Sequence, residues 1–310
     1  MKINTFTMAL AGLFLASCSS QVMKNSLNYP ETKKVEHTDE YFGTKVADPY
    51  RWLEDDRAED TKDWVQREVA FTQNYLNQIP FREEIRAQLK NIWNYEKISA
   101  PFKEGDYTYF YKNDGLQAQS VLYRTDKNGN TEVFLDPNKF SEKGTTSMSG
   151  LSFNKKGTLA AYNISEGGSD WQKIVIINAI TKEKIDETIT DVKFSGASWL
   201  GDEGFFYSSY GKVQGSELSV KTDMHKVYFH KLGTKQSEDK HIIGDENFKR
   251  RYMNIGVSDD ERFLILSAAT ATNGNELYVK DLKNNYTKKT WKLSPIRKKK
   301  KKDMITIPMF

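Results

Sequence analysis

The sequence predicts a mainly β protein whose strands repeat as the blades of a β-propeller, preceded by a helical segment. Two stretches before residue 100 place apolar residues at helical spacings, whereas short β-branched and aromatic runs of period two follow from Pro101. A unit consisting of a polar turn and an outgoing apolar strand recurs at roughly 45- to 60-residue intervals, as propeller blades do. A β-sandwich with ordinary hairpins is the alternative.

The N-terminal residues predict an export signal. Lys2 precedes an apolar stretch from Phe6 to Leu15, and "LASC" ends at Cys18, the single cysteine of the sequence. Residues 1–17 therefore predict a signal peptide and not a membrane span. The small residues before Cys18 resemble a bacterial lipobox, which implies a lipidated Cys18 and an exported protein anchored in the periplasm or at the outer membrane. A plain secretory signal with an incidental cysteine is the alternative.

Two helices are expected before the strands. In the first, Asp60 or Thr61 caps a run of apolar residues at helical spacing that ends before Pro80. The second covers "FREEIRAQLKNIWNY" at 81–95, where acids occupy the first turn and Ile85, Leu89, Ile92 and Trp93 form an apolar stripe.

The strands are expected to form an antiparallel series. They read "YTYFYKN", "SVLYRTD", "TEVFLD", "TLAAYNIS", "KIVIINAIT", "GFFYSSY", "KVYFHKL", "FLILSAAT" and "ELYVKDL", and Asn128-Gly129 predicts a hairpin turn. The recurring unit appears as "PFKEGDYTYFY", "LSFNKKGTLAAY", "ASWLGDEGFFYS" and "GVSDDERFLILS".

Charge and histidine placement exclude some classes of function. The net charge of +4 owes much to the basic run at 297–302, so the body is nearly neutral and nucleic-acid binding is not supported. His225 and His230 fall on opposite faces of one predicted strand, which disfavours a shared metal ion, and His37 and His241 lie in polar surroundings. We expect neither a metal nor a cofactor.

The stretch "KVADPYRWLED" at 45–55 resembles the N-terminal signature of the prolyl oligopeptidase family of serine peptidases. Further matches follow in order: "GLQAQSVLY" at 115–123, "LDPN" at 135–138, "GSDWQKI" at 168–174, "VKFS" at 192–195, "GFFYSSY" at 204–210 and "VYFHKLGTKQSED" at 227–239. The resemblance extends over about residues 29–282. A sister oligopeptidase that cuts after basic residues shares the first signature, but "GLQAQSVLY" and "GSDW" favour the prolyl member.

The resemblance implies a domain organisation. In the family, a seven-bladed propeller covers an α/β-hydrolase domain on which the N-terminal segment packs. Residues 19–100 then correspond to that segment, and 101–285 correspond to an incomplete propeller of about four blades. The family hydrolyses short peptides after proline, and its propeller restricts access to the catalytic site.

The resemblance also implies roles for individual residues. Asp170 of "GSDW" would make a charged contact to the hydrolase domain, and Phe194 of "VKFS" would line the apolar region around the peptide. Met253 would approach the substrate chamber. The alternatives are a turn residue for Asp170 and a core residue for Phe194.

The "DPYRW" residues would join the two domains. The resemblance implies this interdomain role for Asp48, Pro49, Tyr50, Arg51 and Trp52. From chemistry alone, Asp48 could instead be the N-cap of a short turn, with Pro49 as its first helical residue and both rings in a core.

A catalytic triad is not expected within these residues. No Gly-x-Ser-x-Gly turn occurs in the sequence, and the family places its serine, aspartate and histidine in the hydrolase portion. The tail "YTKKTWKLSPIRKKKKKDMITIPMF" at 286–310 lacks blade character, and a frameshift in an A-rich coding stretch would produce such a tail. A genuine basic tail that binds anionic headgroups is the alternative.

Two functions follow from these observations, beside a third hypothesis in which the gene is a disrupted remnant with no activity, as the tail at 286–310 suggests. In the first, the chain is the N-terminal and propeller part of a serine-type prolyl oligopeptidase, inactive alone, which acts on short proline-containing peptides only together with a hydrolase domain. In the second, it is a lipid-anchored β-propeller that binds a partner and has no enzymatic activity.

Overall fold

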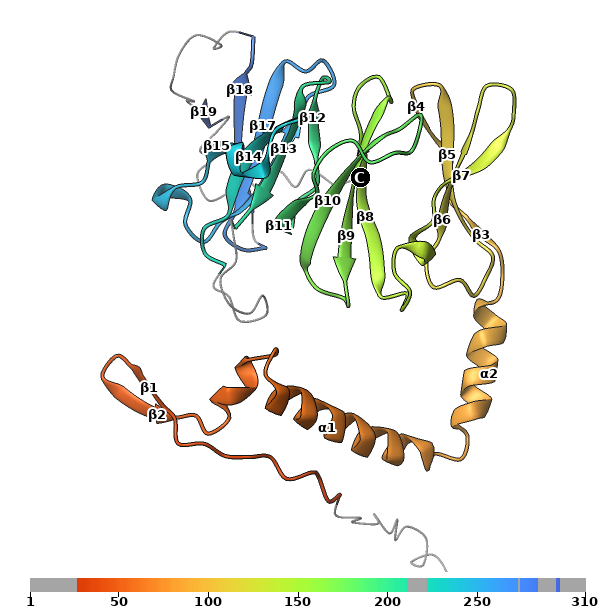
Figure 1. Ribbon diagram of the computed structural model, residues 1–310. Helices are drawn as coiled ribbons and strands as arrows, with labels where there is room; N and C mark the ends of the chain where they lie inside the picture. The colour runs from red at the N-terminus through yellow and green to blue at the C-terminus, as the bar shows by residue number, and fades with distance from the viewer. Residues whose placement is uncertain (1–26, 211–221, 273, 284–293, 296–310) are drawn as a thin grey trace, which may run out of the picture. The chain divides into compact units, whose positions relative to one another are not determined.

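The computed structural model describes residues 27–210, 222–272, 274–283 and 294–295. The chain divides into two compact units, one formed by residues 1–53 and 57–79 and the other by 54–56 and 80–310. The first unit holds a hairpin and a helix, and the second holds a helix followed by antiparallel sheets (Figure 1). Within the described residues, no helix is long and apolar enough to cross a lipid bilayer.

In the first unit, an extended segment lies along a long helix. The hairpin strands are β1 (Thr38–Tyr41) and β2 (Thr44–Ala47), and they are followed by the 3-10 turn η1 (Arg51–Glu54) and α1 (Glu59–Asn77). The Trp64 indole donates to the Thr32 hydroxyl at 2.9 Å, and the rings of Tyr29 and Phe71 lie 4.9 Å apart. The predicted cap of this helix is wrong: the N-cap is Ala58, which makes no side-chain capping bond, because the helix already begins at Glu59.

The second unit starts with α2 (Arg82–Trp93), which confirms the second predicted helix. Its predicted apolar stripe is present on the surface and not in a core. Ile85, Leu89, Ile92 and Trp93 are between 47 and 65% exposed.

The strands of the second unit form successive antiparallel meanders, as the sequence predicts. The first meander has β3 (Lys97–Ile98), β4 (Phe102–Glu104), β5 (Tyr107–Asn113), β6 (Val121–Thr125) and β7 (Thr131–Leu135), and the second has β8 (Thr146–Phe153), β9 (Leu159–Glu166), β10 (Trp171–Asn178) and β11 (Ile189–Lys193). The third has β12 (Ser198–Leu200), β13 (Gly204–Ser209), β14 (Lys226–Lys231) and β15 (Lys240–Ile243), and the fourth has β16 (Tyr252–Val257), β17 (Phe263–Ala269), β18 (Glu276–Asp281) and β19 (Ser294–Pro295). Short 3-10 turns, η2 (Pro137–Lys139), η3 (Gln236–Glu238) and η4 (Glu246–Phe248), lie between strands. The four meanders match the predicted blades, with the second and third joined through the pair Val192–Ser209.

The hairpin predicted at Asn128-Gly129 connects β6 to β7. Gly129 adopts a φ of +87°, which a residue with a Cβ avoids. The Asp126 carboxylate accepts bonds from the backbone N–H groups of Asn128 and Asn130 at 2.8 and 2.9 Å. These bonds give the turn its local stability.

The apolar cores lie between neighbouring meanders. One cluster joins the first two (Tyr109, Leu122, Phe134, Leu135, Ala160, Tyr162, Ile177, Ala179), a second joins the next two (Ala161, Ile174, Ile176, Ile189, Val192, Ala197, Trp199, Phe205, Tyr207), and a third joins the last two (Phe206, Val227, Met253, Ile255, Leu264, Leu266, Ala268, Leu282). In β13, Phe205 and Tyr207 face one neighbour and Phe206 faces the other. A strand buried on both faces must be apolar at consecutive positions, which explains the run "GFFYSS".

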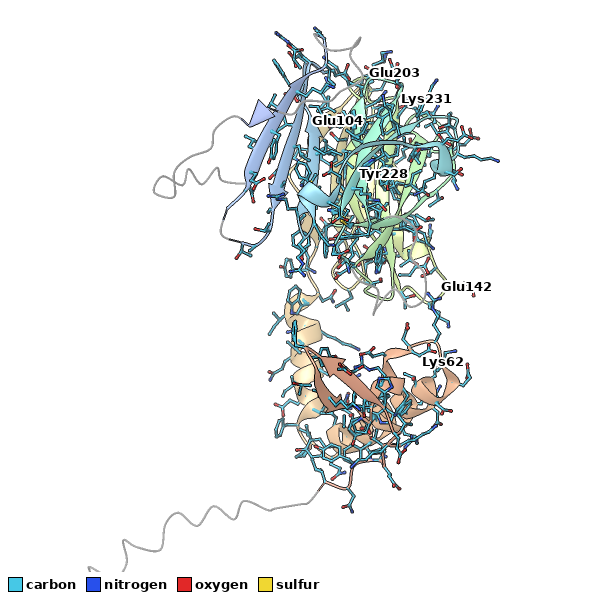
Figure 2. The ribbon with its side chains drawn as sticks, turned by 90° about the vertical axis from the view of Figure 1, so that its left-hand side faces the viewer. Lys62, Glu104, Glu142, Glu203, Tyr228 and Lys231 are labelled. Atoms are coloured by element: carbon cyan, nitrogen blue, oxygen red, sulfur yellow. The ribbon has the colours of Figure 1, made fainter. Side chains whose placement is uncertain are left out.

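Polar contacts between equivalent turns add to this packing. The turns that precede β5, β9, β13 and β17 are equivalent, and each touches the next. Lys156 pairs with Asp202, and the Gly201 N–H donates to the Glu261 carboxylate at 2.8 Å. At Gly105, a Cβ would stand 2.8 Å from the Lys156 carbonyl oxygen, so this approach requires glycine. Figure 2 shows Glu104 and Glu203 beside such turns, at the end of the sheets away from Glu142.

His230 lies in a buried polar cluster between the second and third meanders. Its Nδ1 is 2.7 Å from the Asp239 carboxylate and its Nε2 is 3.4 Å from that of Asp186. Tyr207 donates to Asp239 at 2.7 Å. Burial favours the neutral ring, but the two carboxylates outweigh it and raise the pKa of His230 above its ordinary value.

Arg124 makes a buried contact between the first two meanders. It is 3% exposed, it donates to the backbone carbonyls of Ala179 and Ile180, the latter at 2.9 Å, and it pairs with Glu132 at 2.6 Å. Its guanidinium lies 4.3 Å from the centre of the Tyr107 ring. One side chain therefore satisfies two carbonyls of the neighbouring blade.

We expect Arg124→Met to lower the free energy of unfolding by about 2 kcal/mol, because the substitution keeps the apolar stem and leaves two carbonyls without this donor. Urea denaturation followed by circular dichroism measures the change. Arg86→Met on α2, where the arginine is 51% exposed, is the matched control and should change stability by less than about 0.5 kcal/mol. Equal losses in both variants would contradict the role assigned to Arg124.

Candidate functional site

The three residues predicted to face substrate lie near one end of the second, third and fourth meanders. In an antiparallel meander, first and third strands begin where second and fourth strands end. The start of β10, the ends of β11 and β13, and the starts of β14 and β16 therefore gather at one end of the sheets, where the arrowhead of β9 lies in Figure 1. Asp170, Phe194 and Met253 all belong to this end, which we call the β10 end.

Asp170 stands in an exposed hairpin turn. Gly167 and Gly168 adopt φ values of +60° and +78°, and the side chain of Asp170 is 69% exposed. Lys193 lies 3.9 Å from its carboxylate, while the ammonium sits 5.1 Å from the centre of the Trp171 ring. The carboxylate thus keeps most of its surface open to solvent, with one cation beside it.

Phe194 projects from the β10 end in an unusual backbone conformation. Its φ is +54°, a left-handed value that is uncommon for a bulky side chain and costs on the order of 1–2 kcal/mol. The ring is 49% exposed and contacts Tyr252 edge-to-face at 5.6 Å, and the ammonium of Lys193 lies 5.2 Å from its centre. The core alternative for Phe194 does not fit this exposure. Such strain held at an exposed aromatic residue is typical of binding sites.

Met253 is buried beneath this surface. It is 1% exposed and packs in the cluster between the third and fourth meanders. Its backbone N–H donates to Nδ1 of His225 at 2.9 Å. The Met253 side chain is enclosed by this cluster. Its predicted approach to the substrate chamber therefore stays a prediction.

His225 connects Met253 to the Phe194 region. Its Nε2 is 3.0 Å from the carbonyl oxygen of Lys193, and its ring stacks on Tyr210 at 4.5 Å. Burial disfavours the charged ring and lowers the pKa of His225 to about 4, although the Lys193 carbonyl works in the opposite direction. Burial also raises the pKa of Tyr210 to about 12, with Tyr252 adding to the shift.

The residues of the N-terminal signature contact their own unit. The Asp48 carboxylate accepts from the N–H of Tyr50 at 3.2 Å and pairs with Arg51 at 3.0 Å, as in the turn alternative. Arg51 also pairs with Asp39. The indole of Trp52 donates to the Lys33 carbonyl at 2.9 Å, and the carbonyl of Pro49 accepts from the N–H of Val35 at 3.0 Å. The interdomain role of Asp48, Pro49, Tyr50, Arg51 and Trp52 stays a prediction.

Other predictions lie outside the described residues. Cys18 and nearly all of 286–310 belong to this group, apart from the strand β19, which pairs with Tyr278 and Val279. Across the described ranges, no group of three or more His, Cys, Asp or Glu side chains is arranged to hold a metal ion. His37 and His241 are exposed and His225 and His230 are buried.

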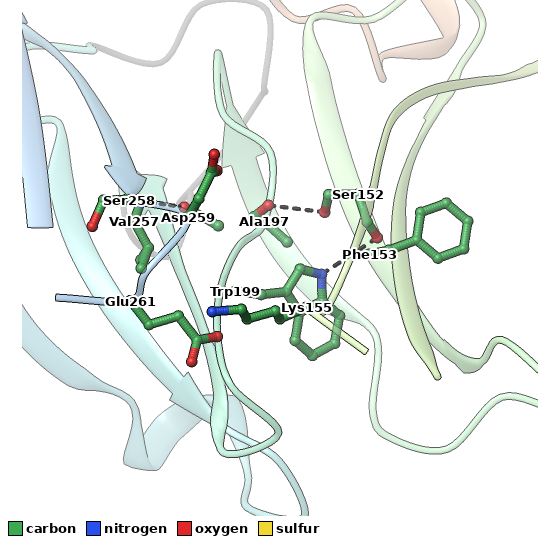
Figure 3. A pocket seen from close by; sticks show the side chains of 10 residues that line it. Ser152, Phe153, Lys155, Ala197, Trp199, Val257, Ser258, Asp259 and Glu261 are labelled. Atoms are coloured by element: carbon green, nitrogen blue, oxygen red, sulfur yellow. Dashed lines mark hydrogen bonds between the residues drawn. The ribbon is translucent and has the colours of Figure 1, made fainter. Parts of the chain in front are cut away.

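A cavity of about 390 Å³ lies at the opposite end of the sheets (Figure 3). Its walls come from β8, β12 and β16 and the turns that follow them, with Phe153, Trp199 and Val257 beside Lys155 and Glu261. The Trp199 indole donates to the Ser152 carbonyl at 3.3 Å. The sequence did not predict this cavity, although its lining falls in three of the four recurring units. The lining residues occupy equivalent positions in successive repeats, and this pattern could have predicted the cavity.

Comparison with known proteins identifies the family. Residues 30–307 match the family model described as "Prolyl oligopeptidase, N-terminal beta-propeller domain". The chain belongs to the prolyl oligopeptidase family. It is 70% identical over 285 residues to a prolyl endopeptidase of Elizabethkingia meningoseptica. The aligned region covers 92% of this chain and 40% of that relative. It is 31% identical over 322 residues to prolyl oligopeptidase A of Amanita bisporigera, covering 93% of this chain and 42% of the relative.

Solved structures agree with the family assignment. Prolyl oligopeptidase B of Galerina marginata, bound to a 25mer macrocyclization substrate, superposes with a TM-score of 0.68 at 28% identity, covering 82% of this chain and 39% of that one. Oligopeptidase B of Leishmania major shares the fold, with a TM-score of 0.69 at 18% identity, over 88% of this chain and 40% of that one. The chain thus spans about 40% of the length of the prolyl endopeptidase relatives and corresponds to their N-terminal propeller domain.

We expect His225 to make stability depend on pH. The unfolded chain protonates this ring near the ordinary pKa of 6.5 and the folded chain only near 4, so the contribution of His225 to stability is lost as pH falls through this window. The difference in free energy of unfolding between the native chain and His225→Gln should therefore narrow by roughly 1–2 kcal/mol between pH 7.5 and 5. Urea denaturation at three pH values measures it; a constant or widening difference would refute the assignment.

Proposed function

We propose that this chain is the N-terminal and propeller part of a serine-type prolyl oligopeptidase, that its β10 end faces peptide substrate, and that these 310 residues do not hydrolyse peptides alone. The observation that supports it best is the clustering of Asp170 and Phe194 with Lys193 and Tyr252 at one end of the blades. Residues from the second and fourth blades come together there, although they are widely separated in sequence.

The chemistry of the β10 end suits a peptide held against a second domain. Asp170 offers a largely exposed carboxylate, which can pair with a cation on the facing domain. Phe194 and Tyr252 offer two partly exposed rings, which suit the apolar side chains that flank a proline. Long-lived burial of these rings against a peptide would offset the strain at Phe194.

Hydrolysis needs a catalytic triad, and this sequence lacks the turn that carries its nucleophilic serine. Acyl transfer of this class uses a serine on a sharp turn, a histidine base and an aspartate. No Gly-x-Ser-x-Gly turn is present in the sequence, and the buried His230, whose Nδ1 lies beside Asp239, has the Asp186 carboxylate and not a serine at its Nε2. We assign the chain to substrate access and positioning and assign bond cleavage to a hydrolase portion.

Hydrolysis of a chromogenic peptide with proline before the leaving group tests this proposal. Residues 19–310 alone should release no chromophore above background, and the same residues joined in frame to the coding sequence of a hydrolase domain should turn over. Turnover by residues 19–310 alone would refute the assignment of catalysis. An inactive joined chain that binds a protein partner would instead favour the non-enzymatic propeller.

We also propose that the chain is exported and anchored to a bacterial membrane through an acylated Cys18. The apolar stretch before "LASC" supports this, since a multiply acylated cysteine holds a protein at a bilayer where one short chain does not.

Cys18→Ser should move the protein from the membrane fraction to the soluble periplasmic fraction, and it should abolish incorporation of a labelled fatty acid. Fractionation and labelling in a bacterial host measure both. Ser20→Ala is the matched control and should stay in the membrane fraction. Unchanged labelling in Cys18→Ser would exclude lipidation at this residue.

A further inference from the structure

His225 lies where three blades meet. It precedes β14 in the third meander, its Nε2 is 3.0 Å from the carbonyl of Lys193 at the end of the second, and its Nδ1 is 2.9 Å from the N–H of Met253 at the start of the fourth. The ring is 1% exposed and stacks on Tyr210 at 4.5 Å. Each polar atom of this ring therefore has a partner on a different blade.

The partners fix the tautomer of His225. A backbone N–H can only donate, so Nδ1 accepts the bond from Met253 and carries no proton. A carbonyl oxygen can only accept, so Nε2 carries the proton and donates it to Lys193. The ring is neutral with its single proton on Nε2, and either another tautomer or a charged ring would lose the bond to Met253.

These two bonds hold the backbone on either side of the exposed aromatic pair. The Lys193 carbonyl belongs to the peptide bond that leads into Phe194, whose φ is +54°. The Met253 N–H belongs to the peptide bond that follows Tyr252. The rings of Phe194 and Tyr252 meet edge-to-face at 5.6 Å. Displacing either bond would shift the ring attached to it.

We propose that His225 is a positioning residue that holds Phe194 and Tyr252 in one fixed arrangement as an apolar platform for the peptide substrate. This inference rests on the proposed function, because the platform is assigned to substrate there. His225 would act through the backbone of its neighbours, without contacting the peptide.

Other titratable groups also face this connection. Lys193 approaches from β11, Tyr210 from the end of β13 and Tyr252 from β16, while Asp223 and Arg251 lie within two residues of His225 and Met253 along the chain. A proton added at Nδ1 would set two donors against each other at the Met253 N–H. Acidification should therefore loosen the platform in the same way as a substitution.

Three variants separate positioning from simple stability. His225→Phe keeps the stack on Tyr210 and removes both hydrogen bonds, His225→Asn keeps an acceptor near Nδ1, and His241→Asn changes an exposed histidine as the matched control. In the 310-residue chain, hydrogen exchange at the Met253 amide should become about tenfold faster in His225→Phe, with partial recovery in His225→Asn. Unchanged exchange in His225→Phe would overturn the inference.

Kinetics of the chain joined to a hydrolase domain give the second readout. His225→Phe should raise KM for the proline peptide by about tenfold and change kcat less than twofold, because the platform contributes to binding. A lower kcat with unchanged KM would mean only less folded enzyme, and it would refute positioning. If the native joined chain is inactive, the proposed function fails, and the exchange data on the 310-residue chain still decide whether His225 holds Met253.

Discussion

Apolar packing between the faces of successive meanders is the constraint on which the second unit depends. Each of its three clusters draws residues from two neighbouring meanders, so no meander completes a core alone. This requirement fixes the composition of the inner strands, which are apolar on both faces.

The candidate site is a consequence of the same arrangement. When blades stand side by side, the ends of their strands converge, and turns that are far apart in sequence become neighbours. Asp170 and Phe194 come from the second blade and Tyr252 from the fourth, and His225 of the third connects the backbones that carry the last two. The buried arginine and histidine clusters between other blades keep the interfaces in register, so the position of one strand end determines the next.

Much of the fold could be predicted from the sequence because its strands and turns depend on local residue patterns. Period two, the Asn128-Gly129 turn and the recurring units correctly predicted the four blades and nine of their strands, whereas β8, β11, β15 and β16 were not among the predicted runs. The capping prediction failed because Asp60 and Thr61 are good caps by type, but the N-cap is Ala58, two residues before Asp60 and three before Thr61. The contacts of His225 could not be predicted, since strand periodicity gives the face of a residue and not the blade that lies opposite.

The cluster between the first two meanders spans Tyr109 to Ala179 in sequence. A chain that grows from its N-terminus therefore has no closed apolar core in this unit until residue 179 is available, and each later core must wait for another blade. Folding should therefore proceed one blade at a time, from the first meander towards the fourth. Until the next blade has been synthesised, the apolar face of the last folded blade stays exposed to solvent. The order and timing of synthesis therefore matter for folding as well as the final packing.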